Sequence, residues 1–139
     1  MKRHLQFLAL LLAALPAGPV LAEPEPPSTL AQLAVQRRDA ARKTYETIWA
    51  NFREGRAPDE NLYRWSLRWL DAERQLSDKH DDHVAAFEAH WERMWELAKI
   101  IRNVRRSGQA TIDEVSATDF YRVEAEMWLL QAREEKKKP

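Results

Sequence analysis

Three histidines lie close together near the middle of the chain, among several carboxylates. His80 and His83 are three residues apart, and His90 follows seven residues later. The acidic neighbours are Asp78, Asp81, Asp82 and Glu88. If a helix begins early enough, His80 and His83 share one face and could bind a metal ion such as zinc or copper. We favour a polar capping turn with His90 on a solvated flank, because the spacing fixes no third and fourth ligand. No cofactor is expected.

Six tryptophans are many for a chain of 139 residues. Trp65 and Trp69 are four residues apart, as are Trp91 and Trp95, so each pair shares one face of a helix. We favour the interpretation that these pairs fill the core between two packed helices. The alternative is an exposed aromatic strip that binds a protein partner or a glycan.

No set of residues in the sequence has the types and spacing of a catalytic site. The chain has no cysteine nucleophile, no serine–histidine–aspartate arrangement at a strained turn and no glycine-rich phosphate loop. Glu73 and Glu126 lie at matching places of an internal repeat and could be imagined as paired carboxylates. Ordinary ion pairs with neighbouring arginines are the simpler interpretation. We therefore expect a protein without enzymatic activity.

The segments that position these residues occur twice in the chain. Residues 53–76 and 106–129 align at an offset of 53. The identical pairs across the repeat are Ile48/Ile101, Arg53/Arg106, Gly55/Gly108, Ala57/Ala110, Ala72/Ala125, Glu73/Glu126 and Leu76/Leu129. Each copy contains a helix end, a glycine turn and an amphipathic helix, so the repeat unit is a helical hairpin.

The turn signals divide the chain into four helices. Capping boxes start the first helix at Thr29 and the fourth at Thr111, and Pro58 fits the first position of the second helix. Gly55 and Gly108 are suited to positive φ just past a helix end. The predicted helices span about 29–54, 58–76, 82–107 and 111–133, with Asp81 or Asp82 capping the third.

Apolar residues recur at helical spacing in every predicted helix, and we expect each row to be buried. The rows are Leu30, Ala34, Ala41, Tyr45, Ile48 and Phe52; Leu62, Trp65, Trp69, Ala72 and Leu76; Val84, Phe87, Trp91, Met94, Ala98 and Ile101; and Phe120, Val123, Met127 and Leu130. No strand pattern is present. The sequence thus predicts an all-α fold, either an antiparallel four-helix bundle or two stacked helical hairpins from an internal duplication.

The beginning of the chain has the layout of a secretory signal peptide. Lys2 and Arg3 precede an apolar run from Leu5 to Leu15, and small or aliphatic residues precede a cut before Glu23. An uncleaved membrane anchor is the alternative, but the run is short. We expect a signal peptide over 1–22, a proline-rich spacer over 23–28, one helical domain over 29–133 with repeat units 29–78 and 82–133, and a charged tail over 134–139.

Removal of residues 1–22 leaves a chain with 20 basic and 22 acidic residues. That balance, without a basic face or tail, argues against a nucleic-acid partner. The mature chain contains no segment expected to span a membrane. We therefore expect an exported, periplasmic protein whose partners are proteins of the cell envelope or further copies of itself.

Both repeat copies resemble the helical-hairpin repeats of the TolC-type outer-membrane efflux family. The residues that carry the resemblance are Gly55, Ala57, Leu62, Ala72, Glu73 and Leu76, and again Gly108, Ala110, Val115, Ala125, Glu126 and Leu129. The resemblance implies long antiparallel helices and a scaffold or interaction role in the cell envelope, beside an efflux or secretion machine. It does not extend to the barrel strands of that family. The alternative function is a periplasmic sensor or chaperone that binds a small ligand or a metal.

Overall fold

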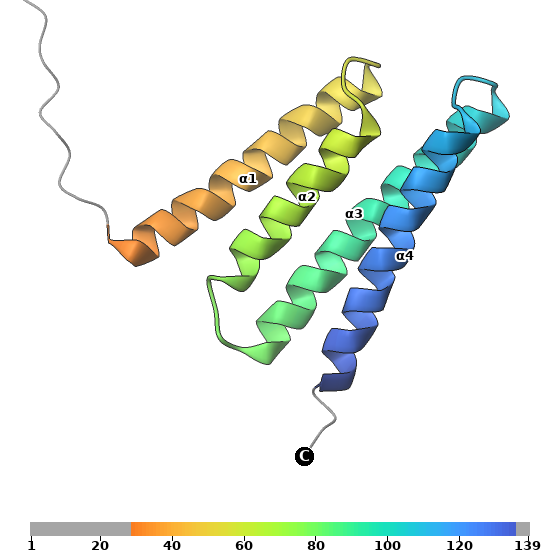
Figure 1. Ribbon diagram of the computed structural model, residues 1–139. Helices are drawn as coiled ribbons and strands as arrows, with labels where there is room; N and C mark the ends of the chain where they lie inside the picture. Colours follow the sequence, from red (N-terminus) through yellow and green to blue (C-terminus); the bar gives the residue numbers. More distant parts are fainter. Residues whose placement is uncertain (1–28, 136–139) are drawn as a thin grey trace, which may run out of the picture.

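The computed structural model describes residues 29–135, which form four α-helices and no strand (Figure 1). The helices are α1 (Leu30–Arg53), α2 (Asp59–Arg74), α3 (His80–Arg106) and α4 (Ile112–Glu135). The expected all-α fold is confirmed. The predicted signal peptide and spacer lie outside the described residues. None of the four helices has an apolar stretch of the length and hydropathy that crossing a bilayer requires.

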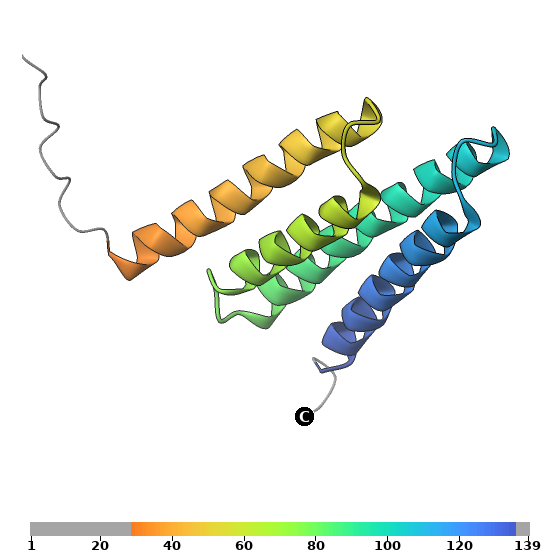
Figure 2. The same cartoon turned by 45° about the horizontal axis from the view of Figure 1, so that its top comes forward.

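The helices form two hairpins that stack through α2 and α3. The backbone of α1 comes close only to α2, α3 pairs most extensively with α4, and α2 meets α3 along its length and α4 at few points. Figures 1 and 2 show α1 at one edge of the stack and α4 beside α3 at the other. Of the two arrangements expected, the described chain is therefore a stack of hairpins, with α1 open to one side.

The two hairpin turns have the same geometry. Gly55 and Gly108 both adopt positive φ, at 71° and 79°. In each turn the residue after the glycine donates its N–H to the carbonyl five positions earlier, which closes the end of the preceding helix. These bonds are Arg56 N–H to Asn51 C=O at 2.8 Å and Gln109 N–H to Val104 C=O at 3.1 Å. The offset of 53 residues therefore relates backbone hydrogen bonds as well as residue types.

The predicted capping boxes are confirmed at both places. Thr29 and Gln32 exchange hydrogen bonds at the start of α1. At the start of α4 the Thr111 N–H donates to Glu114 Oε2 at 2.6 Å, and the Glu114 N–H donates to Thr111 Oγ1 at 3.2 Å. The bond from the Thr111 backbone, followed by that from its hydroxyl, lowers the pKa of Glu114.

Two boundaries differ from the sequence prediction. Pro58 is the N-cap of α2, one residue before the first helical position, with φ −75° and ψ 153°. α3 begins earlier than expected, at His80 after the N-cap Lys79, so Asp81 and Asp82 lie in its first turn instead of capping it. There their negative charge stabilises the helix N-terminus without a side-chain cap.

The core lies where α2, α3 and α4 meet. Leu62, Met94, Leu97 and Ala125 are fully buried there. Small residues allow the helices to approach closely: Ala72 of α2 and Ala125 of α4, which match across the repeat, are both buried. Tyr45 anchors α1 to the same cluster.

Three of the expected buried rows are wrong: those of α1 and α2 at one end, where Leu30 and Leu76 are exposed, and that of α4 throughout. Leu30 is 84% exposed because α2, with 16 residues against 24 in α1, ends before it can cover the start of α1. The predicted row of α4 is exposed throughout: Phe120 by 60%, Val123 by 44%, Met127 by 54% and Leu130 by 51%. α4 instead buries the opposite side of the helix, with Thr118, Ala125, Leu129 and Ala132.

Candidate functional site

The exposed large apolar side chains of α4 lie on one side of the helix, and we call this set the outer stripe. It consists of Ile112, Phe120, Val123, Met127 and Leu130. From Phe120 onward the steps are three, four and three residues, the spacing of a coiled-coil seam. Large apolar residues gathered in this way on a surface mark interaction sites, whereas isolated ones do not.

Both flanks of the outer stripe are already attached to the rest of the fold. On one flank Glu124 accepts a hydrogen bond from the Tyr63 hydroxyl of α2 at 2.5 Å. On the other flank Asp119 pairs with Arg102 of α3. Further along that flank Arg133 pairs with Glu88 of α3 at 2.8 Å. Since these bonds fix the rotation of α4, the stripe faces directly away from α2 and α3.

The outer stripe matches, across the repeat, the face through which α2 meets the second hairpin. Phe120, Val123 and Met127 correspond to Leu67, Leu70 and Arg74 at the offset of 53. In α2 these residues face α3 and α4, and the Arg74 guanidinium lies 4.8 Å from the centre of the Phe87 ring. About one turn earlier in α2, Tyr63 stacks on Tyr121 of α4, with ring centres 4.0 Å apart. The same face is therefore covered in the first hairpin and uncovered in the second.

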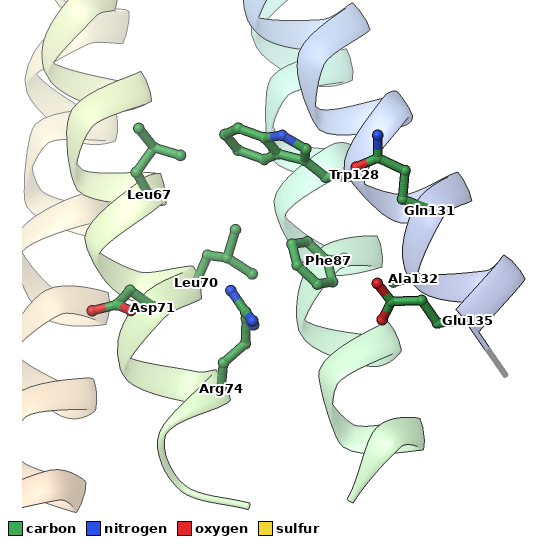
Figure 3. A pocket seen from close by; sticks show the side chains of 9 residues that line it. All are labelled: Leu67, Leu70, Asp71, Arg74, Phe87, Trp128, Gln131, Ala132 and Glu135. Atoms are coloured by element: carbon green, nitrogen blue, oxygen red, sulfur yellow. The ribbon is translucent and has the colours of Figure 1, made fainter. Parts of the chain in front are cut away.

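A groove lies between α2 and α4, with α3 as its floor (Figure 3). Its volume is about 360 Å³. Leu67 and Leu70 point into it from α2, Trp128 from α4 and Phe87 from the floor. Arg74 and Glu135 are at its polar rim. The groove is the unfilled part of the stacking surface between the two hairpins.

A buried polar cluster joins α2 to α3 beneath that surface. Ser66 and His90 are both fully buried, with Ser66 Oγ 2.8 Å from His90 Nδ1. Arg93 Nε donates to the same Ser66 oxygen at 2.7 Å. The hydroxyl proton is thus directed to His90 Nδ1, which leaves the histidine proton on Nε2. Nε2 has no hydrogen-bond partner among residues 29–135. Burial, and secondarily the charge of Arg93, lowers the pKa of His90 to about 3.

Arg93 also connects the cluster to α1. Its guanidinium lies 4.0 Å from the centre of the Trp69 ring and 5.6 Å from that of Tyr45. Burial lowers the pKa of Arg93. These aromatic faces, together with Trp49, line a cleft of about 580 Å³ between α1 and α3. Cation–π contact stabilises the charge there.

The predicted metal ligands are not brought together. His83 Nε2 lies 2.6 Å from the carbonyl oxygen of Ser77, in the turn before α3. His90 lies two turns along α3 from His83 and contacts Ser66 in the core, so its expected place on a solvated flank is wrong. Within the part of the chain that the structure describes, no three histidine, aspartate or glutamate side chains are grouped in a way that could hold a metal ion.

The four tryptophans singled out from the sequence have different surroundings. Trp65, Trp69 and Trp91 are half-buried against the core, and Arg68 covers Trp65 at 4.5 Å. Trp95 is more exposed, at 44%. The residues therefore do not form one continuous exposed strip.

Glu73 and Glu126 belong to separate local pairs. Glu73 accepts a hydrogen bond from Trp69 Nε1 at 2.8 Å, whereas Glu126 accepts one from Arg122 at 2.9 Å. Trp69 and Arg122 are themselves matching positions of the repeat. Each carboxylate thus bonds to the residue four positions earlier in its own helix.

Comparison with protein-family models, curated proteins and solved structures finds no match to this chain.

Proposed function

We propose that this protein is an exported, non-enzymatic interaction module that binds other protein chains through the outer stripe of α4. The observation that supports the proposal is a row of large apolar side chains on a helix whose two flanks are both occupied. A helix face of this kind associates with another helix through residues three and four positions apart. Covering it removes apolar area from water, which favours association.

The cell envelope is the compartment that the sequence supports. The leader-like start before Glu23 and the resemblance of both hairpins to TolC-type repeats favour it. Mass measurement of the protein recovered from the periplasm tests this part. We expect a chain that begins at Glu23, and a full-length chain retained in the cytoplasm would contradict it.

Site-specific photo-crosslinking in the producing cells tests the interaction. A photoreactive amino acid at Val123 lies in the outer stripe, whereas one at Thr47 lies on the exposed polar side of α1. We expect an adduct from position 123 and none from 47. Adding Phe120→Glu should remove the adduct, because a carboxylate would have to be desolvated in the interface. Equal crosslinking from both positions, or from neither, would overturn the proposal.

A small-ligand role is the second candidate, and the groove between α2 and α4 is the observation that favours it. Its volume is within the range of small-molecule sites, and its walls are mostly apolar. A ligand that fits should raise the unfolding free energy by about 2.7 kcal/mol at 100 times its dissociation constant. Leu67→Trp should fill the groove and abolish that effect. Thermal unfolding with a library of small apolar compounds measures it.

A further inference from the structure

We propose that the occupant of the outer stripe is the outer stripe of a second copy of this chain, paired antiparallel about a twofold axis beside Ala125. This inference depends on the proposed function, since it names the partner of the same surface. Three features of the described chain favour this occupant: the spacing of the row, the charges on its flank and the polar character of the opposite edge of the stack.

The row is self-complementary when one copy is reversed. Phe120 and Leu130 are equally far in sequence from Ala125, and so are Val123 and Met127. Under a twofold axis at that level, each of the four apolar side chains from Phe120 to Leu130 therefore meets another of the second copy, whereas Ile112 lies outside the paired stretch. Twofold interfaces require such a match, because the same surface supplies both sides.

The charged flank is complementary in the same register. Asp119 and Arg133 lie on the flank that faces α3. With the axis at Ala125, Asp119 of one copy is level with residue 131 of the other, two residues or about 3 Å from Arg133, which side chains of this length can span. Reversal brings Asp119 of one copy beside Arg133 of the other, on both sides of the axis. Asp119 and Arg133 are each already paired with a residue of α3 in their own copy. The new contact between them therefore joins two ion pairs into a row of four charges of alternating sign. Glu126 meets its own copy at the axis, where Arg122 offsets its charge.

Parallel pairing lacks this match. In a parallel coiled coil the flank residue of one helix meets the opposite flank of its partner five positions further on. Asp119 would then face Glu124 of the second copy, and the two negative charges would repel each other.

Head-to-tail stacking is disfavoured by the other end of the molecule. There the free side of α1 exposes Arg42, Lys43, Glu46 and Thr47. A polar outer helix is what terminates a stack of helical repeats. Apart from Leu30, Leu33 and Val35 near its start, the exposed surface of α1 is mostly polar, whereas large apolar side chains recur along the exposed side of α4.

The area of the stripe is sufficient for a reversible dimer. The four apolar side chains from Phe120 to Leu130 offer on the order of 100 Å² each, or roughly 800 Å² for both copies together, before the charged flank is counted. That is in the range of weak, transient protein–protein interfaces. We therefore expect a dissociation constant in the micromolar range, with monomer and dimer in rapid exchange.

Sedimentation equilibrium of the purified full chain tests the pairing. We expect a monomer–dimer equilibrium, with no larger species as concentration rises. The double variant Phe120→Glu/Met127→Glu should be monomeric with unchanged helical circular dichroism. The control Leu33→Glu/Val35→Glu, which places the same charges on exposed apolar positions of α1, should still dimerise. A monomeric wild type, open-ended growth, or a dimer that survives in the stripe variant would overturn the proposal.

A charge exchange tests the antiparallel register. Asp119→Arg and Arg133→Asp should each raise the dissociation constant about fivefold. The double variant should restore it, although both pairs with α3 remain broken in that variant. Failure of the double variant to recover would contradict antiparallel pairing.

The crosslink at Val123 separates failure of this inference from failure of the proposed function. An adduct with twice the mass of the chain supports both. An adduct with a different protein keeps the interaction module and overturns the second copy as its partner, and no adduct at all overturns both.

Discussion

The two hairpins share a turn, a helix start and a row of inward residues, yet they differ in what covers their outer face. α2 and α4 both begin four residues after a positive-φ glycine, and Ala72 and Ala125 are buried at matching positions. α2 then uses a second face to meet the next hairpin, whereas the matching face of α4 is exposed. An internal duplication therefore repeats the face through which one hairpin packs on the next, and in the second hairpin that face is exposed.

Truncation at matching positions should separate the covered face from the open one. Leu70 of α2 is 5% exposed, whereas its counterpart Val123 is 44% exposed. Leu70→Ala should lower the unfolding free energy by at least about 2 kcal/mol, because it leaves a cavity in the stack. Val123→Ala should change it by less than about 0.5 kcal/mol in dilute protein. Chemical denaturation measures both, and equal losses would show that the faces are not different.

The buried histidine should make the junction between hairpins sensitive to acid. The pKa of His90 is about 3 in the folded chain, against 6.5 for an ordinary histidine. Between these values the unfolded chain binds a proton that the folded chain does not, so stability falls as the pH falls. The loss should be about 1.4 kcal/mol per pH unit below about 6.5.

The variant His90→Gln isolates this effect from other titrations. Its unfolding free energy should depend less on pH than that of the wild type between pH 7 and 5, a range above most carboxylate pKa values. Denaturant titrations of both proteins at several pH values give the two slopes. Identical slopes would mean that His90 accepts a proton in the folded state as readily as in the unfolded one.

The two turns should respond alike to the same substitution. A Cβ added at Gly55 or Gly108 would meet no atom within 4 Å, so the cost arises only from positive φ. We expect Gly55→Ala and Gly108→Ala each to lower the unfolding free energy by about 1–2 kcal/mol. Thermal unfolding of both variants checks this. A large difference between the two would show that the turns are not equivalent.

The helix starts should show a smaller, unequal effect. Thr111→Ala removes the hydroxyl that accepts from the Glu114 N–H and donates to the Glu114 carboxylate, while the backbone half of the capping box of α4 remains, and should cost about 1 kcal/mol. The matching Pro58 makes no side-chain cap, so Pro58→Ser adds a capping oxygen but loses the rigidity of proline. We expect these effects nearly to cancel. Differential scanning calorimetry of both variants measures the loss of stability. A loss in Pro58→Ser as large as that in Thr111→Ala would contradict this assignment of the caps.

Local signals in the sequence were sufficient for the helices and turns. Capping boxes at Thr29 and Thr111 and glycines at positions 55 and 108 act within a few residues, so they can be identified without knowledge of the packing. The predicted cap of α3, Asp81 or Asp82, is wrong, because the helix begins after Lys79. Several residues of the preceding segment could cap a helix, so the sequence alone does not identify the N-cap.

The burial of α4 could not be read from its periodicity. Phe120, Val123, Met127 and Leu130 have the spacing of a core row, but α4 has a second usable face of smaller residues. Which face is buried depends on the helices that α4 meets, and a pattern in one helix does not contain that information. The repeat does bear on this question. Phe120 and Val123 of the outer stripe match Leu67 and Leu70, which lie on the face through which α2 packs on the second hairpin.

The Ser66–His90–Arg93 cluster was also out of reach of the sequence. Ser66 and His90 are 24 residues apart on different helices. Their meeting depends on the register between α2 and α3, which no local motif specifies. Serine and histidine are common on protein surfaces, so the sequence alone would place both residues at the surface.

The distance between labels on two copies of the chain tests most directly whether the open face of α4 pairs with itself. The chain contains no cysteine, so the variant Ser116→Cys has a single site to which a spin label can be attached. Antiparallel pairing about Ala125 predicts a distance of roughly 30 Å between the two labels, because they lie 18 residues apart along the paired helices. A distance of about 10 Å would indicate parallel helices. Either that result or the absence of any intermolecular distance would contradict the account.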